Sequence, residues 1–145
     1  MDEPAPDAQA RAEHAAAAMY AADDASRALG IVIDAVAPGS ARARMRVTSA
    51  MVNGHAIAHG GYIFLLADTA FAFACNTYGS AVAGAAEIVF VAPAREGDEL
   101  VADAVERVTY GRSGVYDVTV RTAEGRVVAE FRGQSRTLRA GAETP

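Results

Sequence analysis

The chain has 145 residues, of which 52% are hydrophobic and 21% are charged, and this predicts one globular domain able to bury its own core. Its formal net charge of −5 at pH 7 argues against nucleic acid as the main partner, because no surplus of Lys and Arg is available to displace counterions from phosphates. The single cysteine, Cys75, excludes an intrachain disulfide, so the composition does not require an oxidising compartment.

The sequence also predicts where the protein is found. The acidic start of the chain, Met1 to Pro4, has no basic segment before an apolar run, as a signal peptide would have. The apolar run at 62–75 is too short to span a bilayer, and it contains a carboxylate. We therefore expect a soluble, cytoplasmic protein that has no membrane partner. Residues 1–6 and 140–145 are expected to be loose ends around an ordered core of about 8–139.

The first half of the chain predicts one helix and two strands. Residues 7–28 are rich in alanine, with Asp7 as the expected N-cap and Gly30 as the stop, and they predict a helix. The apolar run 31–37 predicts a short strand that ends in a proline–glycine turn. Apolar and arginine side chains alternate over 40–48, which is typical of a strand with one buried and one solvated face.

A long apolar helix and four further strands follow. The helix is expected over 61–77, and it has no polar face, which is typical of a buried helix. The strands are expected at 81–92, 99–110, 115–122 and 127–138. Short connections make neighbouring strands antiparallel. One sheet covers only one side of an apolar helix, so the pattern predicts a second subunit on the other side.

The most informative residue is Asp68, a carboxylate inside the apolar helix. Burying an unpaired charge costs several kcal/mol, so Asp68 is the first candidate for chemistry. The structural alternative is that Asp68 is a buried carboxylate that accepts a hydrogen bond from a backbone N–H group. Gly60 and Gly61 stand at the expected start of the same helix, where free N–H groups and the helix dipole can form an oxyanion hole. A glycine turn that merely admits the helix is the alternative.

Spacing separates the two candidates. Asp68 follows Gly60 by eight residues, which is about 12 Å along a helix axis. Groups that act on one carbonyl lie within roughly 3–4 Å of it. If both residues are catalytic, each site therefore takes Asp68 from one subunit and the Gly60 amide from the other.

Weaker candidates lie around this pair. His59 stands next to the glycines and could add a donor, while Asn53 could orient a water or simply form a turn. Arg112 and Ser113, in a predicted turn, could bind a phosphate, although a short polar turn proves little. Cys75 has no basic neighbour to lower its pKa, so we expect a packed thiol.

Motifs for cofactors and metals are absent from the sequence. It contains no Walker loop, no Gly-x-Gly-x-x-Gly and no cysteine–histidine spacing of a metal site. His59-Gly60-Gly61 is similar to an α/β-hydrolase oxyanion loop, but no Gly-x-Ser-x-Gly elbow accompanies it. We therefore expect neither a cofactor nor a metal.

Three segments form a recognisable motif: Asn53-Gly54-His55, His59-Gly60-Gly61, and Leu66-Ala67-Asp68-Thr69-Ala70-Phe71-Ala72. This motif closely resembles the hot-dog acyl-CoA thioesterases of the phenylacetic acid degradation (PaaI) type. The similarity extends from about Ala15 to Leu138. The resemblance implies an α+β hot-dog fold, in which an antiparallel sheet wraps around one long helix, here with an extra N-terminal helix. It also implies dimers, commonly paired into tetramers, and hydrolysis of acyl-CoA thioesters.

The resemblance also implies roles for individual residues. Asp68 matches the catalytic carboxylate and Gly60 the amide that polarises the thioester carbonyl, and His59 and Asn53 match assisting residues. Relatives often have a serine or threonine at the position of Ala83 or Gly84. This chain has no side-chain hydroxyl at either position, so the resemblance implies no hydroxyl group acting there. Contacts with substrate or CoA are expected from Gly61, Thr69, Ala83, Gly84, Arg112 and Ser113.

Phenylacetyl-CoA and its ring-hydroxylated forms are the expected substrates. Asp68 acts either as a general base on water or as a nucleophile that forms an anhydride, and the sequence does not choose. The alternative from another class is a non-catalytic acyl-CoA-binding protein on the same fold. A hydratase ranks low, because it would need an Asp and a His together in the loop before the helix.

Overall fold

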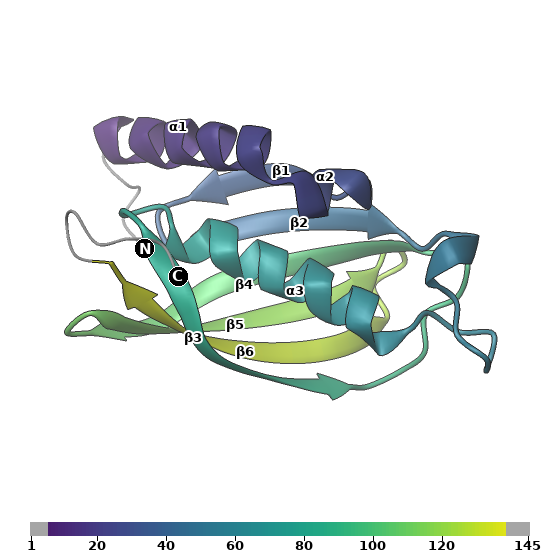
Figure 1. Cartoon of the computed structure of the whole chain (residues 1–145). Coiled ribbons are helices and arrows are strands. Elements are labelled where there is room, and N and C mark those ends of the chain that lie inside the picture. The colour runs from purple at the N-terminus through teal and green to yellow at the C-terminus, as the bar shows by residue number, and fades with distance from the viewer. Residues whose placement is uncertain (1–5, 139–145) are drawn as a thin grey trace.

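A six-stranded antiparallel sheet curves around one long helix in the computed structural model, which describes residues 6–138 (Figure 1). The helices are α1 (Pro6–Ala22), α2 (Asp24–Ala28) and α3 (Gly60–Cys75), with a 3-10 turn at Ser49–Met51. The strands are β1 (Val32–Ala37), β2 (Ser40–Arg46), β3 (Ala81–Phe90), β4 (Glu99–Tyr110), β5 (Ser113–Thr122) and β6 (Val127–Thr137), in the sheet order β1-β2-β4-β5-β6-β3. The predicted α+β hot-dog fold, an antiparallel sheet around one long central helix with an extra N-terminal helix, is confirmed.

The predicted single helix at 7–28 is wrong, because the chain breaks it at Asp23. This residue leaves helical geometry, and its side chain accepts a 2.9 Å hydrogen bond from the Ser26 N–H, which starts α2. Asp7 lies in the first turn of α1 instead of at its N-cap. Gly30, with a φ of 72°, follows the end of α2 as predicted. Apart from Pro6, the predicted loose ends at 1–6 and 140–145 lie outside the described residues.

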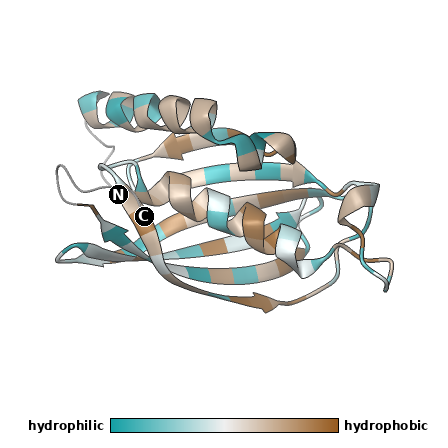
Figure 2. Cartoon of the chain, in the orientation of Figure 1, coloured by the Kyte–Doolittle hydropathy of each residue, from teal (hydrophilic) through white to brown (hydrophobic). Residues whose placement is uncertain are grey.

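The alternation predicted for 40–48 is confirmed in β2, which is banded in Figure 2. Ala41, Ala43 and Met45 are buried against α3, while the arginines between them face away from it. We call the side of the sheet away from α3 the outer face. Arg42 pairs there with Asp103 at 2.7 Å and Arg44 with Asp34 at 2.9 Å. This outer face is thus largely charged and solvated, in contrast to the helix side.

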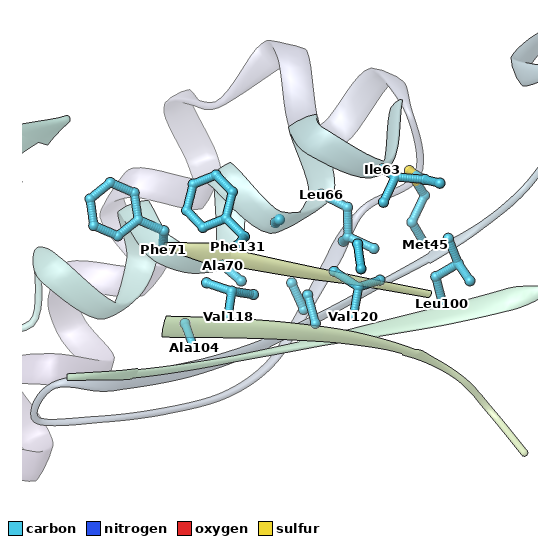
Figure 3. Packing of buried hydrophobic residues seen from close by; sticks show 14 of the residues in the cluster. Met45, Ile63, Leu66, Ala70, Phe71, Leu100, Ala104, Val118, Val120 and Phe131 are labelled. Atoms are coloured by element: carbon cyan, nitrogen blue, oxygen red, sulfur yellow. The ribbon is translucent and has the colours of Figure 1, made fainter. Parts of the chain in front are cut away.

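The core lies between α3 and the sheet (Figure 3). Leu66 and Ala70 are fully buried, and Phe71 packs edge-on against Tyr116 with ring centroids 5.6 Å apart. Figure 2 shows α3 as mostly apolar, which explains why the helix occupies the concave side of the sheet. No helix within 6–138 combines the length and the apolar character needed to cross a membrane.

The helix ends two residues earlier than predicted, at Cys75, because Asn76 caps it. The Asn76 amide donates to the carbonyl oxygens of Ala72 at 2.8 Å and Ala81 at 3.0 Å, and its Oδ1 accepts from the Ala81 N–H at 2.9 Å. One side chain therefore ends α3 and fixes the start of β3.

One stripe of α3 is not covered by the chain itself. Its members are spaced by three or four residues and are all partly or fully exposed: Gly61, Phe64, Leu65, Asp68 and Ala72. We call these five residues the open stripe. Asp68 lies in its middle, so the predicted buried helix is buried on one side only.

Of the two edges of the sheet, β3 is the open one. At the other edge, α1 lies beside β1 (Figure 1), and Gln9 donates to the Val36 carbonyl at 2.8 Å. Residues 83–87 of β3 are exposed, and Gly84 forms a bulge, because Ala83 pairs with Ser135 while Ala85 pairs with Gln134. Such an edge is a template for another strand.

Gly133 allows Phe71 to pack as closely as it does, which gives a first prediction. A Cβ at Gly133 would lie 2.8 Å from two Phe71 ring atoms. We expect Gly133→Ala to lower the free energy of unfolding by about 1–3 kcal/mol in urea titrations, because the ring would have to move. Gly54→Ala is the control, since a Cβ there meets nothing within 4 Å. Equal stability of the two variants would contradict this packing.

Candidate active site

Two backbone hydrogen bonds anchor the segment that leads into α3. The His59 N–H donates to the Met51 carbonyl at 2.7 Å, and the Ala58 N–H donates to the Ala94 carbonyl at 2.8 Å. Since the second of these bonds joins the segment to the loop after β3, the start of α3 has a fixed position relative to the edge strand.

His59 is the N-cap of α3. Its Nδ1 accepts a 2.9 Å hydrogen bond from the Gly61 N–H. An accepting Nδ1 carries no proton, so the neutral ring carries its proton on Nε2, which is left as a donor. The exposed His59 ring can therefore offer an N–H to a ligand.

The cap separates the roles of the two glycines. The Gly61 N–H is engaged by His59, whereas the Gly60 N–H has no acceptor within residues 6–138. As the first helical residue, Gly60 also lies at the positive end of the α3 dipole. Of the predicted pair, Gly60 is thus the one whose amide is free to bind a developing oxyanion.

Asp68 is half-buried in the open stripe, and its carboxylate has no hydrogen-bond or ion-pair partner in the described part of the chain. Burial raises the pKa of Asp68 above its ordinary value of 3.8, because the charged form is partly desolvated. The alternative of a carboxylate that caps its own backbone therefore lacks the required hydrogen bond. A partly exposed carboxylate of raised pKa is suited to accept a proton.

Within one chain, Asp68 and Gly60 are not brought together. Both lie on the same straight helix, eight residues and about 12 Å apart along its axis. One carbonyl group cannot reach both of them in a single subunit.

Asn53 is held in the loop before α3. Its Oδ1 accepts a 2.9 Å hydrogen bond from the His55 N–H, as in an Asx turn, so the predicted turn-forming role is present. Its amide NH₂ has no acceptor within the described range and remains a donor. Asn53 can therefore hold a water or a carbonyl oxygen by donating to it.

Three further predicted contact residues lie in different surroundings. Thr69 is only 7% exposed, and its hydroxyl lies 3.0 Å from that of Ser26, so it joins α3 to α2. Ala83 and Gly84 lie exposed on the open edge strand β3. The substrate contacts predicted for these three residues stay predictions.

Arg112 lies in the turn between β4 and β5, and Ser113 is the first residue of β5, so the turn predicted for Ser113 ends one residue earlier. Both residues are far from Gly60. The Arg112 guanidinium donates twice to the Thr137 carbonyl, at 3.2 and 2.9 Å, and so ties the hairpin to β6. Ser113 lines a small cavity together with Cys75, at the C-terminal end of α3. Their predicted contact with CoA phosphates stays a prediction.

Cys75 is buried, and burial raises the pKa of its thiol to about 12. A thiol of such high pKa is protonated at neutral pH and is a poor nucleophile. No group of three or more His, Cys, Asp or Glu between residues 6 and 138 is arranged to hold a metal ion.

The structure adds a residue that the sequence analysis did not include. The ring tip of Phe90, at the end of β3, lies against Gly60: a Cβ at Gly60 would be 2.8 Å from Phe90 Cζ. The predicted strand at 81–92 contains the information that could have identified Phe90. Side chains two residues apart in a strand lie on the same face, so Phe90 shares a face with Ile88, which packs against the core.

Comparisons with known proteins identify the family to which the chain belongs. The model of the thioesterase superfamily matches residues 55–129. The acyl-coenzyme A thioesterase PaaI of Escherichia coli (strain K12) is 46% identical over 122 residues, which are 83% of this chain and 87% of that protein. A structure of the E. coli PaaI protein, from the phenylacetic acid degradation operon, superposes with a TM-score of 0.88 at 44% identity and covers 90% of this chain and 96% of that one.

More distant structures share the fold. A mutant of the phenylacetic acid degradation protein PaaI of Thermus thermophilus has a TM-score of 0.76 at 38% identity, over 78% of this chain and 97% of that one. The smu.793 protein of Streptococcus mutans UA159, whose structure has acetyl CoA bound, has a TM-score of 0.72 at 25% identity, over 74% and 88%. With its helix-wrapping sheet and the match at 55–129, the chain belongs to the thioesterase superfamily.

Proposed function

We propose that the chain is an acyl-CoA thioesterase that hydrolyses aryl- and acyl-CoA thioesters to the free acid and CoA. The observation that carries the proposal is Asp68, a half-buried carboxylate of raised pKa that has no partner among the described residues of its own chain and lies in the middle of the open stripe. The similarity to an acyl-coenzyme A thioesterase, which is 46% identical to this chain, supports thioester hydrolysis as the reaction in which this carboxylate takes part.

The active site is completed by a second copy of the chain. The open edge of β3 is rich in small residues, so the β3 strands of two copies can pair closely in antiparallel fashion. That pairing puts the end of β3, which lies beside Gly60, opposite the start of β3 in the other copy. It also makes the two α3 helices antiparallel, so that the N-terminus of one approaches the open stripe of the other. Two such dimers form the tetramer.

Hydrolysis then proceeds through a tetrahedral intermediate. The Gly60 N–H of one subunit, with the His59 Nε2–H, binds the thioester oxygen, while Asn53 donates to the attacking water. Asp68 of the facing subunit removes a proton as the water oxygen bonds to the carbonyl carbon. The C–S bond then breaks and the CoA thiolate leaves, taking up the proton. In the second route the Asp68 carboxylate itself attacks the carbonyl carbon, the C–S bond breaks and the CoA thiolate leaves, which gives an anhydride. Water then hydrolyses the anhydride to the free acid and the Asp68 carboxyl group, and the thiolate takes up the remaining proton.

Aryl groups are the proposed acyl substituents, with phenylacetyl-CoA and ring-hydroxylated phenylacetyl-CoA first. Phe64, next to Asp68 in the open stripe, is partly exposed and packs edge-on against Phe131, with ring centroids 5.4 Å apart. The names of two similar structures place those proteins in phenylacetic acid degradation. A cytoplasmic location is proposed with this function, because a chain with a single cysteine does not require an oxidising compartment.

A panel of CoA thioesters at matched concentrations tests the proposal. Thiol release is followed with a chromogenic disulfide for acetyl-, hexanoyl-, phenylacetyl- and hydroxyphenylacetyl-CoA. We expect turnover of the panel, fastest for the two aryl compounds. Calorimetric binding of phenylacetyl-CoA with no release of thiol from any compound would instead identify an acyl-CoA-binding protein.

A further inference from the structure

Three consecutive apolar side chains are exposed at the end of the open edge strand. Val89 is 64% exposed, Phe90 53% and Val91 55%. Figure 2 shows that the end of β3 is apolar and lies below the N-terminal part of α3 in this view. Exposed apolar patches of this kind mark surfaces that contact a ligand or a partner.

Of the three, Phe90 is the one that reaches the proposed oxyanion donor. Successive side chains of a strand point to opposite faces, and Ile88 packs toward the core, so Phe90 lies on the helix side and Val89 on the outer face. The Phe90 ring tip occupies the space that a side chain at Gly60 would need, with Cζ and Cε1 at 2.8 and 3.1 Å from an added Cβ.

Glycine at position 60 thus serves two neighbours at once. It leaves its N–H open to a carbonyl oxygen, and it lets the Phe90 ring occupy the position where a side chain of residue 60 would begin. An acyl group whose oxygen is bound by the Gly60 amide has its first carbons next to the ring. An aryl ring one methylene away from the carbonyl carbon comes within the roughly 4.5–7 Å at which two rings interact.

We propose that Phe90 is a specificity-determining residue that forms one wall of the acyl pocket and selects aryl over alkyl acyl groups. This inference rests on the proposed thioesterase function, because it needs the thioester oxygen on the Gly60 amide. An acetyl group offers the ring a single methyl group, and flexible alkyl chains contact it without the ring–ring geometry.

Exchange of the ring for an aliphatic side chain tests the inference. In Phe90→Leu and Phe90→Met we expect kcat/KM for phenylacetyl-CoA, relative to hexanoyl-CoA, to fall on the order of tenfold. Phe90→Tyr, which keeps the ring, should retain the wild-type ratio. Val89→Ala is the matched control on the opposite face of β3 and should leave the ratio unchanged. Light scattering on each variant confirms that the oligomer is kept.

The outcomes separate this inference from the proposed function. An unchanged ratio in Phe90→Leu and Phe90→Met would overturn it, as would an equal fall of the ratio in Val89→Ala. A wild-type protein that hydrolyses hexanoyl-CoA but not phenylacetyl-CoA would also overturn it and leave the thioesterase function standing. Failure of the wild type to hydrolyse either compound would contradict the proposed function itself.

Discussion

Asp68→Asn is expected to lower kcat for phenylacetyl-CoA by about 10²–10⁴-fold, the usual contribution of a positioned general base. The amide has nearly the same shape as the carboxylate but cannot accept the proton of the attacking water or attack the carbonyl carbon. KM should change little, because Asp68 has no role in binding the ground state. Steady-state kinetics of the variant, with its oligomeric state checked in parallel, measures both effects.

The same substitution should not destabilise the fold. Burial raises the pKa of folded Asp68 above 3.8, so the native state binds the proton more tightly than the unfolded state does. The free energy of unfolding therefore falls as the pH rises from the unfolded pKa through the folded pKa of Asp68, and the wild type carries this penalty once the carboxyl group is ionised. A neutral amide removes it. We expect the Tm of Asp68→Asn at pH 7 to equal or exceed that of the wild type.

The pH dependence gives a second readout of Asp68. Since only the carboxylate form is active, kcat/KM should rise with pH through a pKa above the ordinary value of 3.8. A lower Tm of Asp68→Asn at pH 7, together with retained turnover, would mean that Asp68 holds the structure together and takes no part in the chemistry.

Gly60→Pro is expected to lower kcat by about 10²–10³-fold relative to Gly60→Ala, the effect of losing one oxyanion-hole donor. Proline has no N–H but suits the first helical position. The preceding His59 has an extended ψ of 132°, which is the conformation favoured before a proline. The backbone can therefore accept proline at this position without a change of fold.

Gly60→Ala is the matched control, because both variants add a Cβ that must displace the Phe90 ring tip and only one of them removes the donor. The ratio of the two kcat values therefore measures the loss of the Gly60 N–H alone, because the effect of the added Cβ is common to both variants. Equal activity of Gly60→Pro and Gly60→Ala would show that the Gly60 N–H does not bind the oxyanion.

Much of the fold could be predicted because its patterns are local. Arg42, Arg44 and Arg46 alternate with apolar residues, so one solvated strand face follows from spacing alone. The long, mostly apolar run of α3 predicts a central helix in the same way. The break at Asp23 was missed because the high helix propensity of the surrounding alanines outweighed a capping signal from a single side chain.

The candidate site was harder to predict where contacts join distant segments or depend on the rotamer of one side chain. The pairing of Thr69 with Ser26 spans 43 residues, and the use of the Gly61 N–H by the His59 ring depends on a rotamer. Neither leaves a pattern in the sequence. Asp68 could be found from the sequence because a carboxylate in an apolar helix is conspicuous without any knowledge of its contacts. The structure then shows that the described part of its own chain gives this carboxylate no partner.

The most direct measurement is the activity of mixed oligomers made from two inactive variants. Asp68→Asn and Gly60→Pro subunits are unfolded, mixed one to one and refolded together. A mixed dimer then has one site with both substituted residues and one site in which Asp68 and Gly60 are both intact. With random pairing, about one quarter of all sites are intact, so we expect about one quarter of the wild-type kcat per subunit. If the mixture is as inactive as its parents, while refolded wild type regains full activity, the two residues do not share an active site across subunits.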